Sequence, residues 1–140
     1  MQISSRFTIA SHILLLLAVE GEVTKQTSLT IAGSVGVNPV IVRTILSQLK
    51  QAGLVEVARG VGGARLALPP EDISLLKVYQ AVEVLGQSGN LFGFHDNPNP
   101  DCRIGRQIHP LLDRRLEAAQ SAMEASLAKS SLADLLMEVK

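Results

Sequence analysis

The sequence predicts a mainly α-helical protein with one small β-hairpin, in which a winged helix-turn-helix domain is followed by a long C-terminal helix. Three stretches support this fold class. Residues 28–52 have the pattern of two short helices joined by a tight turn, residues 54–68 that of a glycine-tipped hairpin, and residues 104–127 repeat apolar side chains at helical spacing. A chain of 140 residues suits one domain with an arm.

The first predicted helix covers residues 5–19 and is apolar on most of its sides. Because such a helix is buried on most sides, and this protein is small, we interpret it as a helix that a second subunit partly covers. Its apolar run at 13–19 is too short to cross a bilayer, which takes about 20 residues. No signal-peptide cleavage site follows it. We therefore expect a cytoplasmic protein with no membrane association.

The next two predicted helices form the helix-turn-helix. Ser28 is expected to cap a helix over 29–35, and Gly36 to supply the left-handed residue of the turn. Asn38 then caps a second helix over about 39–52, which has proline at its first position. The apolar positions of this helix repeat on one face and are expected to pack inward: Val42, Ile45, Leu46 and Leu49.

A short hairpin is predicted after Gly53, which ends that helix. Apolar and polar residues alternate in two strands with one wet face, at Val55 and Val57 before the loop and at Leu66 and Leu68 after it. The loop 59–65 holds three glycines between two arginines. It is not the phosphate-binding loop of nucleotide hydrolases, because no Gly-Lys-Ser/Thr follows and the order is strand–turn–strand.

The C-terminal half is predicted to hold a linker helix, a loop and a long helix. Ser74 caps the linker helix, which runs to about Leu85, and residues 86–101 have the Gly, Asn, Pro and Asp content of a loop. From 104 to 127 apolar residues recur in steps of three and four, and Pro110 either starts or kinks this helix. A Ser-x-x-Asp capping pattern then precedes a short last helix.

The distribution of charge favours a DNA-binding N-terminal half. Residues 1–70 hold six Lys/Arg against three Asp/Glu, a balance of +3, and residues 71–140 hold seven against ten, a balance of −3. Aromatic residues make up only 3% of the chain, which argues against a protein that binds nucleic acid by stacking bases.

A helix reads base edges when its N-terminal part enters the major groove, so we expect the helix 39–52 to be the recognition helix. Arg43 is the candidate for a bidentate contact with guanine. The glycines of the hairpin tip allow the wing to approach the DNA backbone or the minor groove, where arginine is favoured. The predicted DNA-binding residues are Ser28, Asn38, Val40, Arg43, Thr44, Gln48, Lys50, Arg59, Gly60, Gly62, Gly63 and Arg65.

Three stretches closely resemble the Rrf2 family of bacterial transcription regulators: MQISSRFTIASHILLLLA, IAGSVGVNPVIVRTILSQLKQAGLVEVARGVGGARLALPPEDISLLKVYQAVE and NPNPDCRIGRQI. The resemblance implies a homodimeric transcriptional repressor that binds double-stranded DNA at a palindromic operator. The two half-sites of the operator lie about 34–36 Å apart. It divides the chain into a winged helix-turn-helix DNA-binding domain at 1–70 and, at 71–140, a linker helix, a sensing loop and a dimerisation helix.

The chain departs from the cluster-binding members of that family in its cysteines. Those members carry three in the region that corresponds to about 86–106, where this chain has Cys102 alone. One thiolate per subunit is too few for an iron–sulfur cluster. His12, His95 and His109 do not have the spacing of a metal site. We therefore predict no iron–sulfur cluster and no other cofactor or metal.

Two interpretations of Cys102 stay open. It is either a redox or electrophile switch, favoured by a helix start and by nearby arginines, or an inert cysteine. In the second case the signal is a small molecule or a partner protein held between the C-terminal helix and the loop 86–101. An enzyme with Cys102 as nucleophile lacks a base nearby. A winged helix used only for protein interaction is the remaining alternative, because a fold does not fix a function.

Overall fold

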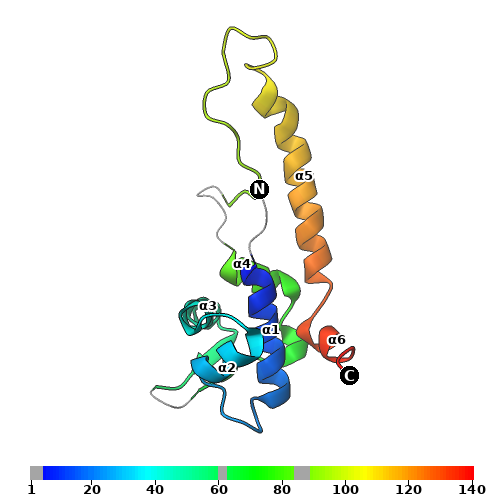
Figure 1. Cartoon of the computed structure of the whole chain (residues 1–140). Helices are drawn as coiled ribbons and strands as arrows, with labels where there is room; N and C mark the ends of the chain where they lie inside the picture. The colour runs from blue at the N-terminus through cyan, green and yellow to red at the C-terminus, as the bar shows by residue number, and fades with distance from the viewer. Residues whose placement is uncertain (1–4, 60–62, 84–88) are drawn as a thin grey trace. The chain divides into compact units, whose positions relative to one another are not determined.

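The structure is a computed structural model that describes residues 5–59, 63–83 and 89–140. The elements follow in the order α1 (Arg6–Glu20), α2 (Ser28–Val35), α3 (Pro39–Gln51), β1 (Val55–Val57), β2 (Ala64–Leu66), the 3-10 helix η1 (Pro70–Asp72), α4 (Leu75–Val82), α5 (Ile108–Ala128) and α6 (Leu132–Leu136) (Figure 1). The predicted fold class, mainly helical with one hairpin and a long C-terminal helix, is confirmed. The chain divides into two compact units, Met1–Glu83 with Leu127–Lys140, and Val84–Ser126.

Helix α1 is the centre of the first unit. It packs against α2, α3, α4 and α6. The core is mainly aliphatic, as the low aromatic content requires, with one buried aromatic residue among those described, Tyr79. Its aliphatic members include Ile13, Leu14, Ile31, Ile45, Leu49, Leu54, Ile73, Val78, Val82 and Leu132. On α1 itself, Leu15 and Leu16 are only partly buried and Val19 is exposed. One apolar side of α1 is therefore not fully covered by the described part of this chain.

The helix-turn-helix forms where the sequence predicts it, with one correction at its start. Thr27, rather than Ser28, is the N-cap of α2: its hydroxyl accepts a backbone N–H of the first turn at 3.2 Å. Both residue types can cap, but Thr27 has the extended backbone that a cap needs, and Ser28 is the first helical residue. Gly36 ends α2 with a φ of 80°, and Asn38 caps α3, as predicted.

Helices α2 and α3 are bent by 109° at their junction, within the range of a helix-turn-helix. The two reach the length and composition of a membrane span only when they are taken together. No single helix among the described residues is long and apolar enough to cross a membrane.

Strands β1 and β2 form the antiparallel hairpin of the wing, in a register that places Glu56 opposite Arg65. Gly53 has a φ of 77°, a conformation that glycine adopts without strain, and it turns the chain from α3 into β1. The backbone N–H of Ala64 donates to the carbonyl of Gln26 at 2.8 Å. The segment before α2 is therefore bonded to the outer edge of β2.

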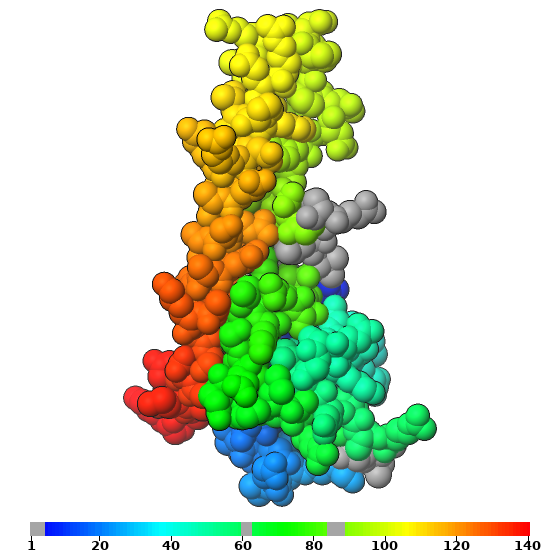
Figure 2. Space-filling view, turned by 180° about the vertical axis from the view of Figure 1, so that it is seen from behind, coloured from blue at the N-terminus to red at the C-terminus, as the bar shows by residue number. Residues whose placement is uncertain are grey.

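Helices α4 and α6 begin next to each other. Ser74 caps α4 as predicted, but the helix ends at Val82 rather than near residue 85. Ser131 caps α6 in the predicted capping box with Asp134. Because Ser74 and Ser131 form an isolated antiparallel bridge, α6 is tied to the start of α4. Figure 2 shows α6, in red, and α3, in blue-green, on opposite sides of α4.

The second unit consists of a loop and most of α5. This helix begins at Ile108, later than the predicted residue 104, and Pro110 lies in its first turn, where a missing N–H is tolerated. Gln120 holds the loop on the helix: its side chain accepts the N–H of Leu91 at 2.9 Å and donates to the carbonyl of Gly89 at 3.0 Å. None of the described residues of α5 is buried.

Candidate nucleic-acid interface

The outward side of α3 is formed by residues spaced three and four apart, which share one helix face. We call it the recognition face; it consists of Val40, Arg43, Thr44 and Ser47, all of them exposed. The opposite side of the helix is buried in the core through Val42, Ile45 and Leu49. Burial of that side fixes the rotation of α3 and so determines which side chains reach solvent.

Beside the recognition face, an open recess of about 310 Å³ lies between α2, α3 and β1. Three predicted DNA-binding residues line it together, Ser28, Arg43 and Lys50, along with Ser47 and Val57. Neither Arg43 nor Lys50 has an ion-pair partner among the described residues. The recess therefore carries positive charge of the kind that phosphate groups neutralise.

Three other predicted DNA-binding side chains have polar groups that are occupied or buried. Oδ1 of Asn38 accepts the N–H of Val40 at 2.8 Å, and the hydroxyl of Thr44 donates to the carbonyl of Val40 at 3.0 Å. Gln48 is half-buried, and its Oε1 is buried without a partner among the described residues. These side-chain oxygens and this hydroxyl group are less available to bases than the guanidinium of Arg43.

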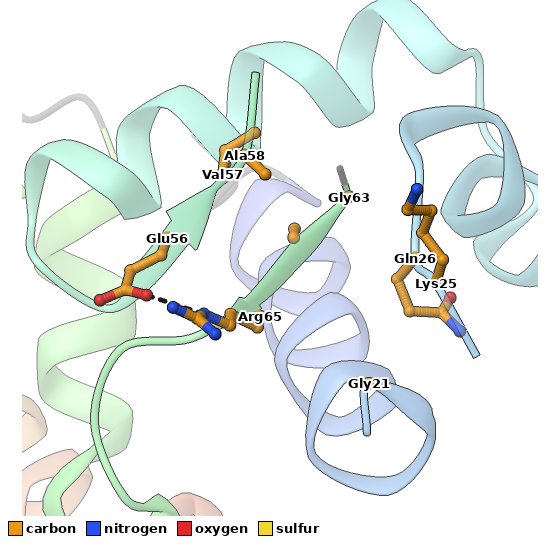
Figure 3. A pocket seen from close by; sticks show the side chains of 9 residues that line it. Gly21, Lys25, Gln26, Glu56, Val57, Ala58, Gly63 and Arg65 are labelled. Carbon is orange, nitrogen blue, oxygen red and sulfur yellow. Dashed lines mark hydrogen bonds and ion pairs between the residues drawn. The ribbon is translucent and has the colours of Figure 1, made fainter. Parts of the chain in front are cut away.

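In the wing, Arg65 is joined to Glu56 across the hairpin (Figure 3). Its Nε lies 2.8 Å from Oε2 of Glu56, and the two side chains are 73% and 56% exposed. An exposed pair contributes about 0–1 kcal/mol of stability, but it offsets the charge of an arginine predicted to clamp DNA. Arg59 is exposed and has no such partner in the described part of the chain. Gly60 and Gly62 lie outside the described residues.

The wing meets the segment before α2 at a cleft of about 580 Å³, drawn in Figure 3. Gly63 has a φ of 76°, and a side chain there would lie 3.0 Å from both the carbonyl oxygen of Gln26 and Cγ of Lys25. Gln26 is itself buried, with its Nε2 donating to the carbonyl of Thr24 at 3.1 Å. Gly63 therefore sets the position of the wing, a requirement separate from any contact with DNA.

Two residues of this surface, Ser47 and Val57, are not among the predicted DNA-binding residues. The helical repeat could have predicted that Ser47 lies on this surface, since it follows Arg43 by one turn of the helix. No such signal exists for Val57, because its position in the recess depends on how the hairpin packs beside α3.

Cys102 lies in a run of turns before α5 and is exposed. The sequence places Cys102 near the predicted start of the long helix, but that start is later than predicted, because the helix begins only at Ile108. The pKa of the Cys102 thiol is nevertheless lowered by hydrogen bonds from the backbone of Gly105 and then of Ile104, against a smaller opposing effect of burial. Backbone N–H groups, rather than a helix terminus, thus favour the thiolate.

Known proteins share this arrangement. Residues 3–138 match the Rrf2 family, described as iron-dependent transcriptional regulators. The protein “Putative HTH-type transcriptional regulator YwnA” of Bacillus subtilis (strain 168) is 45% identical over 134 residues, which cover 96% of each chain. The “Crystal structure of a putative DNA binding protein” has a TM-score of 0.74 at 41% identity, covering 94% of this chain and 99% of that one. IscR of T. potens has a TM-score of 0.72 at 21% identity over 100% of this chain and 89% of that one, a likeness of fold.

The residues present do not fit the iron that the family description names. The chain has one cysteine, whereas iron–sulfur clusters are held by several thiolates. The described residues contain no group of three or more His, Cys, Asp or Glu side chains placed to hold a metal ion. His95 and His109 lie edge to face with ring centroids 6.0 Å apart, and Phe94 packs on His109 at 4.2 Å. This is an aromatic cluster rather than a pair of ligands.

Proposed function

Since the chain belongs to the Rrf2 family of transcriptional regulators, we propose that it is a homodimeric repressor that binds a palindromic operator through α3 and the wing 54–68, without an iron–sulfur cluster. Its family and relatives are transcriptional regulators rather than enzymes, and so is this chain. The recess beside the recognition face carries the proposal. It brings together Ser28, Arg43 and Lys50, and its two cations have no acidic partner among the described residues.

In the proposed complex, α3 enters the major groove with its N-terminal half. Arg43 reads a guanine there, a bidentate contact that contributes about 1–3 kcal/mol of discrimination. Ser28 offers its hydroxyl and the N–H groups of the first turn of α2 to a phosphate, and Lys50 contacts another. The wing adds Arg59, and also Arg65 once its ion pair opens.

The homodimer is proposed from the surface of α5. Leu111 and Leu112 are 49% and 38% exposed on a helix that buries no described residue. A second α5 would cover this apolar surface and would pair two recognition faces, which read half-sites about 34–36 Å apart. A protein that regulates chromosomal genes works in the compartment that holds the chromosome. The proposal therefore includes a cytoplasmic location.

The proposed signal acts at Cys102, where exposure and a lowered pKa favour a reactive thiolate. One Cys102 thiol from each subunit would form a disulfide, giving up two protons and two electrons in total to hydrogen peroxide, which becomes two water molecules. The alternative signal is a small molecule or partner protein that binds where Gln120 holds the loop on α5. Cys102→Ser separates the two, because it removes an oxidant response and leaves an effector response in place.

Selection of bound fragments from genomic DNA, followed by anisotropy titration, tests the DNA-binding proposal. The wild-type protein is expected to bind a palindrome with an affinity that falls on the order of 10³–10⁵-fold between 50 and 200 mM salt, if 6–10 phosphates are contacted. Arg43→Ala should weaken binding roughly 5- to 150-fold for each half-site, which is roughly 30- to 2 × 10⁴-fold for the palindrome, and relax specificity at one base pair of each half-site. Arg114→Ala on α5, which removes the same charge elsewhere, should not. Binding without sequence preference or salt dependence would contradict the proposal.

A further inference from the structure

The recognition face is apolar at its N-terminal end. Val40 is 60% exposed there, and its neighbour Ile41 is 43% exposed. A single exposed apolar side chain is ordinary on a protein surface and decides nothing alone. The groups around Val40 give its exposure a meaning, because they would enter the major groove with it and determine whether the contacts there are polar or apolar.

Two of the polar groups near Val40 already make hydrogen bonds to its backbone. The side-chain oxygen of Asn38 is held by the N–H of Val40 at 2.8 Å, and the hydroxyl of Thr44 is held by the carbonyl of Val40 at 3.0 Å. Because the hydroxyl of Thr44 is bonded to the backbone and the residue is exposed, its γ-methyl group is the part of the side chain that is left to contact DNA. Val40 and Thr44 are one turn apart and form an adjoining pair of methyl-bearing side chains.

Only one base edge in the major groove is apolar, the C5-methyl group of thymine, and small apolar side chains and the threonine methyl are its usual partners. We infer that Val40 and Thr44 contact thymine methyl groups, an inference that rests on the proposed role of α3. These contacts contribute to operator specificity at base pairs next to the guanine that Arg43 reads. Each half-site then contains thymine next to guanine. Sequence specificity on this face then depends on methyl contacts as well as on hydrogen bonds.

The expected size of the effect follows from the burial of one methyl group, about 0.8 kcal/mol. Since 1.36 kcal/mol is a factor of ten, loss of one such contact weakens binding about four-fold. The same loss in both half-sites of a palindrome weakens it about fifteen-fold, because the two sites are separate and their effects add in free energy.

Deoxyuridine tests the inference directly, because it removes the thymine methyl group and leaves every hydrogen-bonding group of the base pair in place. The operator selected with the full-length wild-type protein is synthesised with each thymine replaced symmetrically in turn, and the Kd is measured by anisotropy. Wild type should lose about fifteen-fold at one or two positions. Val40→Ala should bind the thymine and deoxyuridine operators equally at one of them. Thr44→Ser, which keeps the hydroxyl bond and removes only the methyl group, should do the same at the other.

Val23→Ala is the matched control, because Val23 is also exposed, at 81%, and lies outside the recognition face. It should keep the full sensitivity of wild type to deoxyuridine. If wild type distinguishes its operator from a scrambled duplex but no deoxyuridine substitution changes the Kd, the proposed function stands and the methyl inference is wrong. If Val40→Ala and Thr44→Ser keep the deoxyuridine sensitivity, the assignment to these residues is wrong. If no duplex is preferred over any other, the proposed function fails and the inference fails with it.

Discussion

Among single residues, the two arginines Arg43 and Arg65 differ in how available they are to DNA, because they differ in their ion-pair partners. Arg43 and Arg65 are both predicted to contact DNA, but within the described part of the chain only Arg65 has a carboxylate bonded to it, that of Glu56 at 2.8 Å. An exposed ion pair is weak and is readily exchanged for a phosphate. The carboxylate that remains nevertheless repels DNA, so Glu56 should reduce the affinity of the wing.

Removal of this carboxylate should strengthen operator binding. In Glu56→Gln, Arg65 is free to contact a phosphate, and the slope of log K against log salt should steepen by about 1.8, the value for one added contact in each subunit of the dimer. Anisotropy titrations at several salt concentrations measure it. Glu71→Gln makes the same change of net charge on η1, outside the two strands of the hairpin and, among the described residues, with no bond to Arg65. Equal effects of the two substitutions would show that net charge, rather than the release of Arg65, is responsible.

The lowered pKa of Cys102 predicts a shifted pH profile of alkylation. Hydrogen bonds from the backbone stabilise the thiolate, so the thiolate predominates at a lower pH in the folded chain than in the unfolded one. The rate of reaction with iodoacetamide, followed by mass spectrometry, should therefore rise to its plateau at a lower pH in buffer than in denaturing urea. Cys102 is the only cysteine, so the signal is unambiguous. Coincident profiles would mean that the turn does not activate the thiol.

At the scale of the element, the turn between α2 and α3 sets where the recognition face points. Gly36 adopts a φ of 80° there, and Asn38 starts the next helix. A residue with a Cβ atom is strained in this left-handed conformation. The turn therefore depends on glycine for its backbone, rather than for space.

Gly33 within α2 and Gly36 just after it separate the effect of backbone conformation from that of space, because a Cβ atom at either would have no neighbour within 4 Å. Gly36→Ala should lower the free energy of unfolding by about 1–2 kcal/mol, since only its φ is unfavourable for alanine. Gly33→Ala lies within the helix and should raise it by about 0.5–1 kcal/mol. Urea denaturation at one fixed protein concentration measures both. A loss of stability in Gly33→Ala, or none in Gly36→Ala, would contradict the argument.

Across the molecule, the helices and strands could be predicted because short sequence patterns, such as caps and turn residues, determine them. The features that the sequence did not predict depend on contacts between segments that are distant in the chain. Asn38 and Gly36 act on their own neighbours, so the helix-turn-helix could be predicted from the sequence. The ion pair of Arg65 depends on the register of the hairpin, and the exposed turn that holds Cys102 replaces an expected helix start. The division of function at residue 70 and the individual DNA contacts remain predictions, because they depend on DNA and on a second subunit.

The proposed dimer can be tested through the apolar surface of α5, which is exposed in the described chain. Leu112→Glu places a charge on that surface, at a position 38% exposed, so the core of the subunit should fold unchanged. We expect the variant to sediment as a 15.0 kDa monomer. Its affinity for the operator should fall on the order of 10²–10⁴-fold, because the second half-site no longer binds as part of the same molecule.

Ser121→Glu is the matched control for this prediction. Ser121 is exposed on the same helix, and at about 3.6 residues per turn it lies on the side opposite Leu112. This variant should remain a dimer with wild-type affinity, and circular dichroism should show both variants folded. If Leu112→Glu remains dimeric and binds as wild type does, α5 is not the dimer interface. The incompletely covered side of α1, at Leu15, Leu16 and Val19, is then the next surface to test as the dimer interface.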